Sequence, residues 1–137
     1  MADATSASLR KKIKLIIDSI EKKEISELMA YAKPPPGCAE VSLALAILLG
    51  FKSDGTWKAA TRMFFGDSRE FGKRLMHIDE WLGNLSDDRV REIREALKGT
   101  RAEHNNGNDM HMVSSFLGKV ACMLHTAIAF HECDENE

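Results

Sequence analysis

Four residues near the C-terminus have side chains that could bind a metal ion: Cys122, His125, His131 and Cys133. Thiolates and imidazoles are typical zinc ligands, and a structural zinc ion takes four ligands arranged as a tetrahedron. On a continuous helix each residue advances by about 100°, so Cys122 and His125 share one face, whereas His131 lies about 180° from Cys122. The four side chains do not converge, and we expect no metal site. The two histidines are expected on the surface or in the seam of a terminal helix.

Patterns that carry catalysis are also missing from the sequence. There is no GxxxxGK[ST] phosphate-binding loop, and Gly72-Lys73-Arg74 has neither the glycine spacing nor the hydroxyl of one. Asp87 and Asp88 directly follow Ser86, so they are interpreted as charges in the positively polarised first turn of a helix, not as a catalytic pair. We predict neither enzymatic activity nor a bound cofactor for these 137 residues.

Composition limits the class of protein that carries these residues. With 44% hydrophobic and 29% charged residues, the chain is typical of one folded domain. Its three widely spaced cysteines favour a reducing compartment over a disulfide framework. The isoelectric point of about 6.2 disfavours nucleic acid as a partner. The longest apolar run, residues 41–51, is about half a membrane span, and the N-terminal residues show no apolar leader, so no membrane partner is expected.

The elements that must position these side chains are expected to be helices, because the alternation typical of strands is missing. The first helix is predicted over residues 8–32, ending before the stiff elbow Pro34-Pro35-Pro36. The next, residues 36–49, is apolar nearly all round, as in a central core helix, and closes at Gly50. Further helices are predicted over residues 56–65, 67–78 (opened by a capping box at Asp67), 86–99 and 110–131, with a mobile polar loop at 100–109.

The two terminal helices carry long apolar stripes. Four residues of the first follow the four-three-four spacing of a coiled-coil seam: Leu9, Ile13, Ile16 and Ile20. A second stripe takes over on a neighbouring face: Ile17, Ile25 and Leu28. The last helix has one broad stripe between Val113 and Ile128. These stripes fit an antiparallel pair, but neither helix is long enough to supercoil persistently, so a plain bundle is left open.

The elbow and the helix after it form a specific combination. Lys33-Pro34-Pro35-Pro36-Gly37 is followed by Ile47-Leu48-Leu49-Gly50. This combination resembles the microtubule-binding tip of the dynein heavy-chain stalk, where a stalk strand reaches a short proline run and an apolar helix ending in Leu-Leu-Gly follows. The similarity extends over about residues 17–130 and includes three further segments: Thr56-Trp57-Lys58, Phe71-Gly72-Lys73-Arg74-Leu75 and Ile78-Asp79.

The resemblance implies an all-α fold, a small helical bundle at the end of a short antiparallel two-stranded coiled coil. Residues 1–33 would form the first stalk strand, residues 34–112 the globular tip, and residues 113–137 the last tip helix continuing into the return strand. Pro34, Pro35 and Pro36 would be the stalk hinge. The implied function is binding to αβ-tubulin in the microtubule, with an affinity regulated by sliding of the stalk coiled-coil register.

The family also implies a setting for this chain. The rest of the heavy chain, with its ATPase ring, would attach through the stalk, and the protein would act in the cytoplasm on the cytoskeleton. Two positions depart from the family pattern: the only charge early in the core helix is Glu40, and Val113-Ser114 is followed by the neutral Ser115 instead of a basic residue. These departures fit a weakly binding heavy chain of the axoneme of a cilium or flagellum.

Tubulin's surface is acidic, so basic side chains would carry the contact. The candidates are Arg74, Lys73, Lys119, Lys52, Lys58 and Arg62, with Glu40 as the charge of the core helix. Arg74 has the most direct family match, and Lys119, one turn after Ser115, could replace the missing basic residue. The alternative for each is a solvated charge paired with a nearby carboxylate. A second function also stays open, a free-standing helical adaptor that binds another protein's helix through its Met-rich and apolar faces.

Overall fold

The computed structural model describes residues 5–66 and 68–136. Within these ranges the chain forms helices and connecting turns without any strand, which confirms the all-α class. The α-helices are α1 (Ser6–Asp18), α2 (Lys22–Ser26), α3 (Cys38–Leu49), α4 (Trp57–Thr61), α5 (Ser68–Met76), α6 (Ile78–Gly83), α7 (Asp87–Leu97) and α8 (Ser115–Asn136). Within the described residues they are joined by the 3₁₀-helical segments η1 (Glu27–Ala30), η3 (Arg101–Glu103) and η4 (Asn105–Met112) and by the π-helical segment η2 (Arg62–Gly66).

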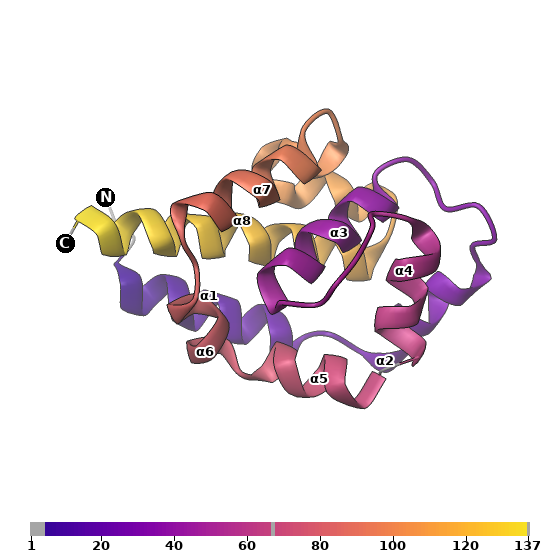
Figure 1. Ribbon diagram of the computed structural model, residues 1–137, viewed down its shortest axis with the longest axis horizontal. Coiled ribbons are helices and arrows are strands. Elements are labelled where there is room, and N and C mark those ends of the chain that lie inside the picture. The colour runs from indigo at the N-terminus through magenta and orange to yellow at the C-terminus, as the bar shows by residue number, and fades with distance from the viewer. Residues whose placement is uncertain (1–4, 67, 137) are drawn as a thin grey trace.

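Helix α3 lies in the middle of the molecule and packs against α4, α7 and α8 (Figure 1). Five of its side chains are completely excluded from solvent: Cys38, Val41, Ala44, Leu45 and Leu48. Gly37 and Gly50 flank the helix in the left-handed region, with φ of +96° and +82°. The Gly50 N–H donates to the Ala46 carbonyl at 2.9 Å and closes the last turn. The prediction of a core helix that ends at Gly50 is therefore confirmed.

Helices α1 and α8 lie side by side and run in opposite directions, so both chain ends are at the same end of the molecule (Figure 1). Ile13 and Ile17 of α1 are buried against α8, where Phe116, Leu117 and Val120 are fully buried. The predicted seam is only partly used, because Leu9, Ile16 and Ile20 are half-buried. The geometry is that of two packed helices in a small bundle.

The sequence predicted one helix over residues 8–32, and this prediction is wrong. Helix α1 ends at Asp18, and the chain continues through an extended Glu21, whose φ and ψ are −106° and 146°, into α2. The Ser19 hydroxyl donates to the Ile16 carbonyl at 2.6 Å, while the Glu24 carboxylate accepts the Glu21 N–H at 2.8 Å. These two local hydrogen bonds end one helix and begin the next, because each replaces a bond of the regular ladder.

Residues 100–109 are not the open loop expected from their polarity. They form η3 and the first part of η4, which packs along α8. Met110 is fully buried and Ala102 has no exposed surface. Accordingly α8 begins at Ser115 and not at residue 110, and the Ser114 hydroxyl accepts the Leu117 N–H at 3.2 Å near its start.

The middle of the chain follows the predicted start signals more closely than the predicted ends. Thr56 and Ser86 accept backbone N–H groups of Ala59 and Arg89 at 3.1 and 3.2 Å, as expected for N-caps. The helix predicted over residues 67–78 ends at Met76, and α6 follows it as a separate helix that was not predicted. The Trp81 indole donates to the Leu75 carbonyl at 3.2 Å across this corner. Asp67, the predicted capping residue, lies outside the described residues.

Candidate binding groove at the end of helix α3

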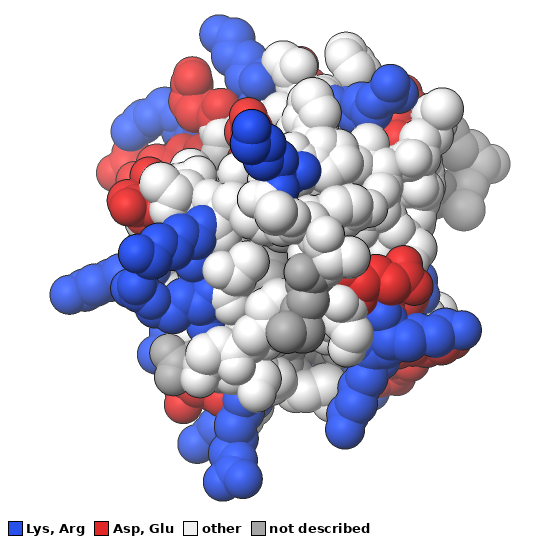
Figure 2. All heavy atoms as spheres, turned by 90° about the vertical axis from the view of Figure 1, so that its right-hand side faces the viewer, with Lys and Arg blue, Asp and Glu red and all other residues white. Residues whose placement is uncertain are grey.

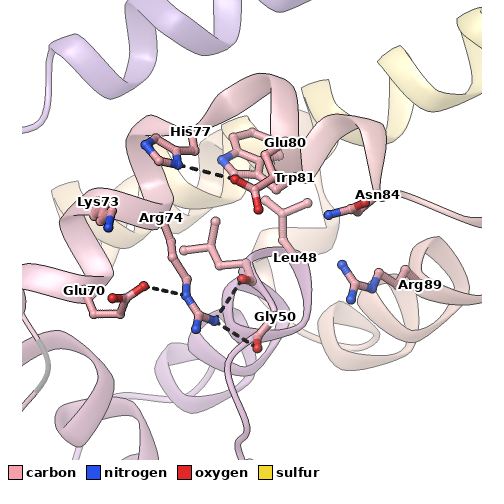
Figure 3. Close-up of a pocket in the computed structure, with 11 residues that line it drawn as sticks. Leu48, Gly50, Glu70, Lys73, Arg74, His77, Glu80, Trp81, Asn84 and Arg89 are labelled. Atoms are coloured by element: carbon pink, nitrogen blue, oxygen red, sulfur yellow. Dashed lines mark hydrogen bonds and ion pairs between the residues drawn. The ribbon is translucent and has the colours of Figure 1, made fainter.

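A groove of about 410 Å³ opens where the C-terminal end of α3 meets α5, α6 and the start of α7. We call it the α3 groove (Figure 3). Its side chains come from four helices and include three basic residues, two acidic residues and a histidine: Lys73, Arg74, Arg89, Glu70, Glu80 and His77. Trp81, Asn84 and Leu48 complete the wall, so the groove joins an apolar floor to a charged rim.

Arg74 is held by interactions within the molecule. Its guanidinium donates to the Gly50 carbonyl at 3.1 Å and to the Leu49 carbonyl at 3.4 Å, and it pairs with Glu70 at 2.9 Å (Figure 3). It also lies over the Phe51 ring, 4.3 Å from the centroid. These groups place a cation at the negative end of α3, where it satisfies carbonyls that lack a partner in the helix. The predicted binding residue thus has a structural role, with 40% of its side chain exposed.

Lys73 and Arg89 are the cations of the groove that remain available for a ligand. Lys73 is exposed and Arg89 is half-buried, and neither forms an ion pair with any residue that the structure describes. Glu80 faces His77, with 3.4 Å between its carboxylate and the His77 Nδ1. The groove therefore offers two cations, Lys73 on one side and Arg89 on the other, to acidic groups of a partner, while Glu70 is already neutralised by Arg74 (Figure 3).

Lys119 has a different environment from the one expected. Its ammonium donates to the Glu24 carboxylate and to the Ser19 carbonyl, both at 2.7 Å, and its side chain is only 23% exposed. Burial acts to raise the pKa of Glu24, but hydrogen bonds from Lys119, the Glu21 N–H and Ser115, together with the Lys119 charge, lower it to about 2. Lys119 therefore ties α8 to the break between α1 and α2.

The remaining predicted residues are spread over the surface. Lys52 follows α3 and Lys58 lies in α4, and both are exposed. Glu40 is in the first turn of α3 and lines a separate hollow of about 400 Å³ together with Pro35, Pro36 and Arg101. Arg62, at the start of η2, is exposed as well. Of the seven residues predicted to contact the partner, the structure brings Lys73 and Arg74 together in one groove and places Glu40 and Lys119 in two other hollows.

The predicted hinge, Pro34 to Pro36, connects η1 to α3 without helical structure. Two long-range hydrogen bonds hold the chain just before it. The Trp57 indole donates to the Tyr31 carbonyl at 3.1 Å, and the Tyr31 hydroxyl donates to the Val113 carbonyl at 3.5 Å. The elbow is thus tied to α4 and to the end of η4.

The end of the molecule opposite the chain termini carries the elbow, α2 and α4. Seen from this side, much of the described surface in the middle belongs to residues other than Lys, Arg, Asp and Glu, whereas Lys and Arg project around much of the border with fewer Asp and Glu between them (Figure 2). A basic border of this kind fits a partner with an acidic surface.

The four residues considered for zinc contact different groups. The His125 ring donates to the Ala102 carbonyl at 2.7 Å, and the His131 Nε2 lies 2.9 Å from Asp87. Cys122 faces His111, which the sequence did not single out, at 3.8 Å. Among the described residues no three His, Cys, Asp or Glu side chains are placed to hold one metal ion.

Arg89 is the groove residue that sequence reasoning missed. Arg91 and Arg94 of the same helix pair with Asp88 and Glu132, whereas Arg89 lines the α3 groove. A signal was available, because Arg89 precedes Ile93 by one turn and so lies beside the buried stripe of the helix.

No protein-family model, no curated protein and no solved structure matches this chain. No described helix has both the length and the apolar character needed to span a bilayer. What the fold and groove define is a small all-helical domain with an internally capped core helix and a charged groove beside it.

Proposed function

We propose that this chain is the microtubule-binding stalk tip of a dynein heavy chain, in the cytoplasm and most specifically in the axoneme of a cilium or flagellum. The observation that carries the proposal is the position of α1 and α8. They lie antiparallel with both chain ends at one end of the molecule, while the elbow is at the other end (Figure 1). This is the arrangement that a tip on a two-stranded stalk requires, and the elbow and α3 carry the residues that resemble the family.

Electrostatics favour a filament with an acidic surface as the partner. Lys52, Lys58 and Lys73 are exposed, and none of them forms an ion pair within the described residues. Lys73 and Arg89 line opposite sides of the α3 groove, where each can meet an acidic group of the partner. Exposed charges of this kind attract an acidic partner over distances of about 10 Å at low salt and are screened as salt rises.

Control by stalk sliding would act on the contacts between α1 and α8. The Lys119 ammonium holds the Ser19 carbonyl at the end of α1, so a shift of α1 along α8 has to break this bond. Ile16 and Ile20 of the first predicted stripe are half-buried beside the buried Ile17 of the second, so a shifted register would exchange one apolar face of α1 for the other.

Co-sedimentation with microtubules at low and moderate salt tests the binding. We expect salt-sensitive pelleting and a roughly three- to fivefold weaker affinity for Lys73→Glu, because one exposed contact charge is worth at most about 1 kcal/mol. Lys11→Glu makes the same charge change at an exposed position of α1, the proposed stalk strand, and should bind as the native chain does. Absence of pelleting at both salt concentrations would favour the adaptor function.

The sliding mechanism needs a separate test. Engineered cysteine pairs that link α1 to α8 in two registers, in a chain whose own cysteines are replaced by serine or alanine, should give different microtubule affinities. Equal affinities in the two registers would rule out control by sliding and leave binding itself unaffected.

A further inference from the structure

A second hollow, of about 290 Å³, lies between α1 and η4 above the middle of α8. We call it the α1–η4 hollow. It contains a thiol, an imidazole and an amide from two elements, with lysines at its rim: Cys122, His111, Asn108, Lys12 and Lys119. The microtubule proposal does not involve this cluster, apart from the Lys119 contact with Ser19 and Glu24.

Two glycines allow η4 to approach α8 closely enough to build the cluster. A Cβ on Gly118 would lie 2.4 Å from the His111 Nδ1, and a Cβ on Gly107 would lie 2.6 Å from the Ala121 carbonyl carbon. Real Cβ atoms do not come so close, so any other residue would push η4 away. Gly107 also has a φ of +88°, which other residues rarely adopt. The His111 ring therefore rests on bare helix backbone beside Cys122.

The Cys122 thiol has both an acceptor and a base within reach. Its S–H donates to the Asn108 side-chain oxygen, with 3.4 Å between sulfur and oxygen, and the His111 Nε2 is 3.8 Å from the sulfur. Burial raises the pKa of Cys122, while the positive charge of Lys12 acts in the opposite direction. The resting group is thus a protonated, half-buried thiol that becomes a nucleophile when a base takes its proton.

The other two cysteines provide a comparison. Cys38 is completely buried, and burial, with the charge of Glu40, raises its pKa to about 11, so it is an inert core thiol. Cys133 is half-exposed near the end of α8 and does not line the α1–η4 hollow. Cys122 is the thiol that lines a hollow together with a histidine and a lysine.

We propose that Cys122 is a thiol-modification site for small anionic disulfides, with His111 as its general base and Lys12 as the charge that attracts the carboxylates of the reagent. His111 takes the thiol proton, and the sulfur attacks one sulfur of the reagent disulfide. The reagent S–S bond breaks, and its second sulfur leaves as a thiolate that receives the proton from His111. One mixed disulfide and one free thiol result, so atoms and electrons balance.

Mass spectrometry of the full chain with glutathione disulfide measures this reaction at each cysteine. We expect Cys122 in Cys133→Ser to react at least about tenfold faster than Cys133 in Cys122→Ser. His111→Gln should remove this advantage and change the pH profile of the rate to that of simple thiol ionisation. The charges facing Cys122 from other elements, Lys12 and Lys119, stay in place in this variant.

Lys12→Gln tests whether the Lys12 charge selects anionic reagents, and the change should leave the fold intact because Lys12 is exposed on α1. It should slow the reaction with glutathione disulfide and leave unchanged the reaction with the uncharged bis(2-hydroxyethyl) disulfide. The proposal is overturned if Cys122 reacts no faster than Cys133. It is equally overturned if His111→Gln, shown by circular dichroism to be folded, keeps the native rate and pH profile.

Discussion

The α3 groove and the α1–η4 hollow each contain a basic residue that the sequence marked for partner binding, and the molecule uses both for itself. Arg74 donates to the carbonyls at the end of α3, and Lys119 donates to a carbonyl at the end of α1. The two sites differ in exposure, since 40% of the Arg74 side chain is exposed but only 23% of Lys119. Lys119 should therefore contribute more to the free energy of unfolding than Arg74, because water cannot replace it at the buried site.

The largest effect is expected for Lys119→Met. This change leaves Glu24, whose side chain is 9% exposed, without its charged partner and leaves the Ser19 carbonyl without that donor. We expect a loss of about 2–3 kcal/mol in the free energy of unfolding, measured in urea. If Lys119→Met loses less stability than Arg74→Ala, the buried cation does not contribute more than the exposed one.

Acid should reduce the stabilisation that the Glu24–Lys119 ion pair gives to the fold. The pKa of Glu24 is lowered from its ordinary value of 4.5 to about 2 in the folded chain, so the stabilisation is complete above pH 4.5 and is lost as pH falls through 2. Asp54 and Asp79, whose pKa values are also lowered by hydrogen bonds, contribute to the acid dependence of the native chain. The difference between native chain and Glu24→Gln in urea unfolding isolates Glu24, and it should shrink across this pH window. A difference that stays constant with pH would assign the low pKa to another group.

Arg74→Ala should have an intermediate effect, a loss of about 1 kcal/mol. It removes the contact with the Phe51 ring and the donors to Leu49 and Gly50, but water can reach these carbonyls in part. Arg74→Lys should recover only part of the loss, because an ammonium cannot reproduce the planar fork of hydrogen bonds. Full recovery by lysine would show that charge alone is needed at the end of α3.

The smallest effect on stability is expected for Lys73→Ala, within about 0.5 kcal/mol of the native chain, because Lys73 is exposed. Thermal unfolding followed by circular dichroism checks this. Lys73→Ala and Arg74→Ala can be compared directly within one groove, because the two residues are adjacent in sequence and only Arg74 caps α3. The difference between their stabilities measures the effect of the cap. A clear destabilisation would mean that Lys73 also has a structural partner.

The predictable parts of the fold depend on local signals. The apolar character of residues 38–49 and the glycine at position 50 identify α3, because a helix apolar on all sides must be buried and glycine readily adopts the left-handed cap. Ser86 identifies the start of α7 in the same way. By contrast, nothing between residues 18 and 22 breaks a helix by propensity, and the break there is stabilised by Glu24 and by Lys119, 95 residues further along the chain.

The candidate sites show the same division. Sequence resemblance selected Lys73 and Arg74, which do share a groove, but it could not tell that one faces solvent and the other caps α3, because the Leu49 and Gly50 carbonyls come from a distant segment. Cys122 was considered only with residues of its own helix. Its actual neighbours are Asn108, from the segment that was predicted as a loop, and His111, which was predicted in the same helix as Cys122 but lies in η4.

The sequence by itself determined the all-α class, the core helix α3, its glycine end and the caps of α4 and α7, since each follows from neighbouring residues and from which side chains avoid water. Tertiary structure alone decided where α1 breaks, how η4 lies on α8 and which cations remain free for a partner. The physical reason is that these features depend on contacts between distant segments, such as the Lys119–Glu24 pair and the Gly118–His111 approach, whose partners a local pattern does not contain.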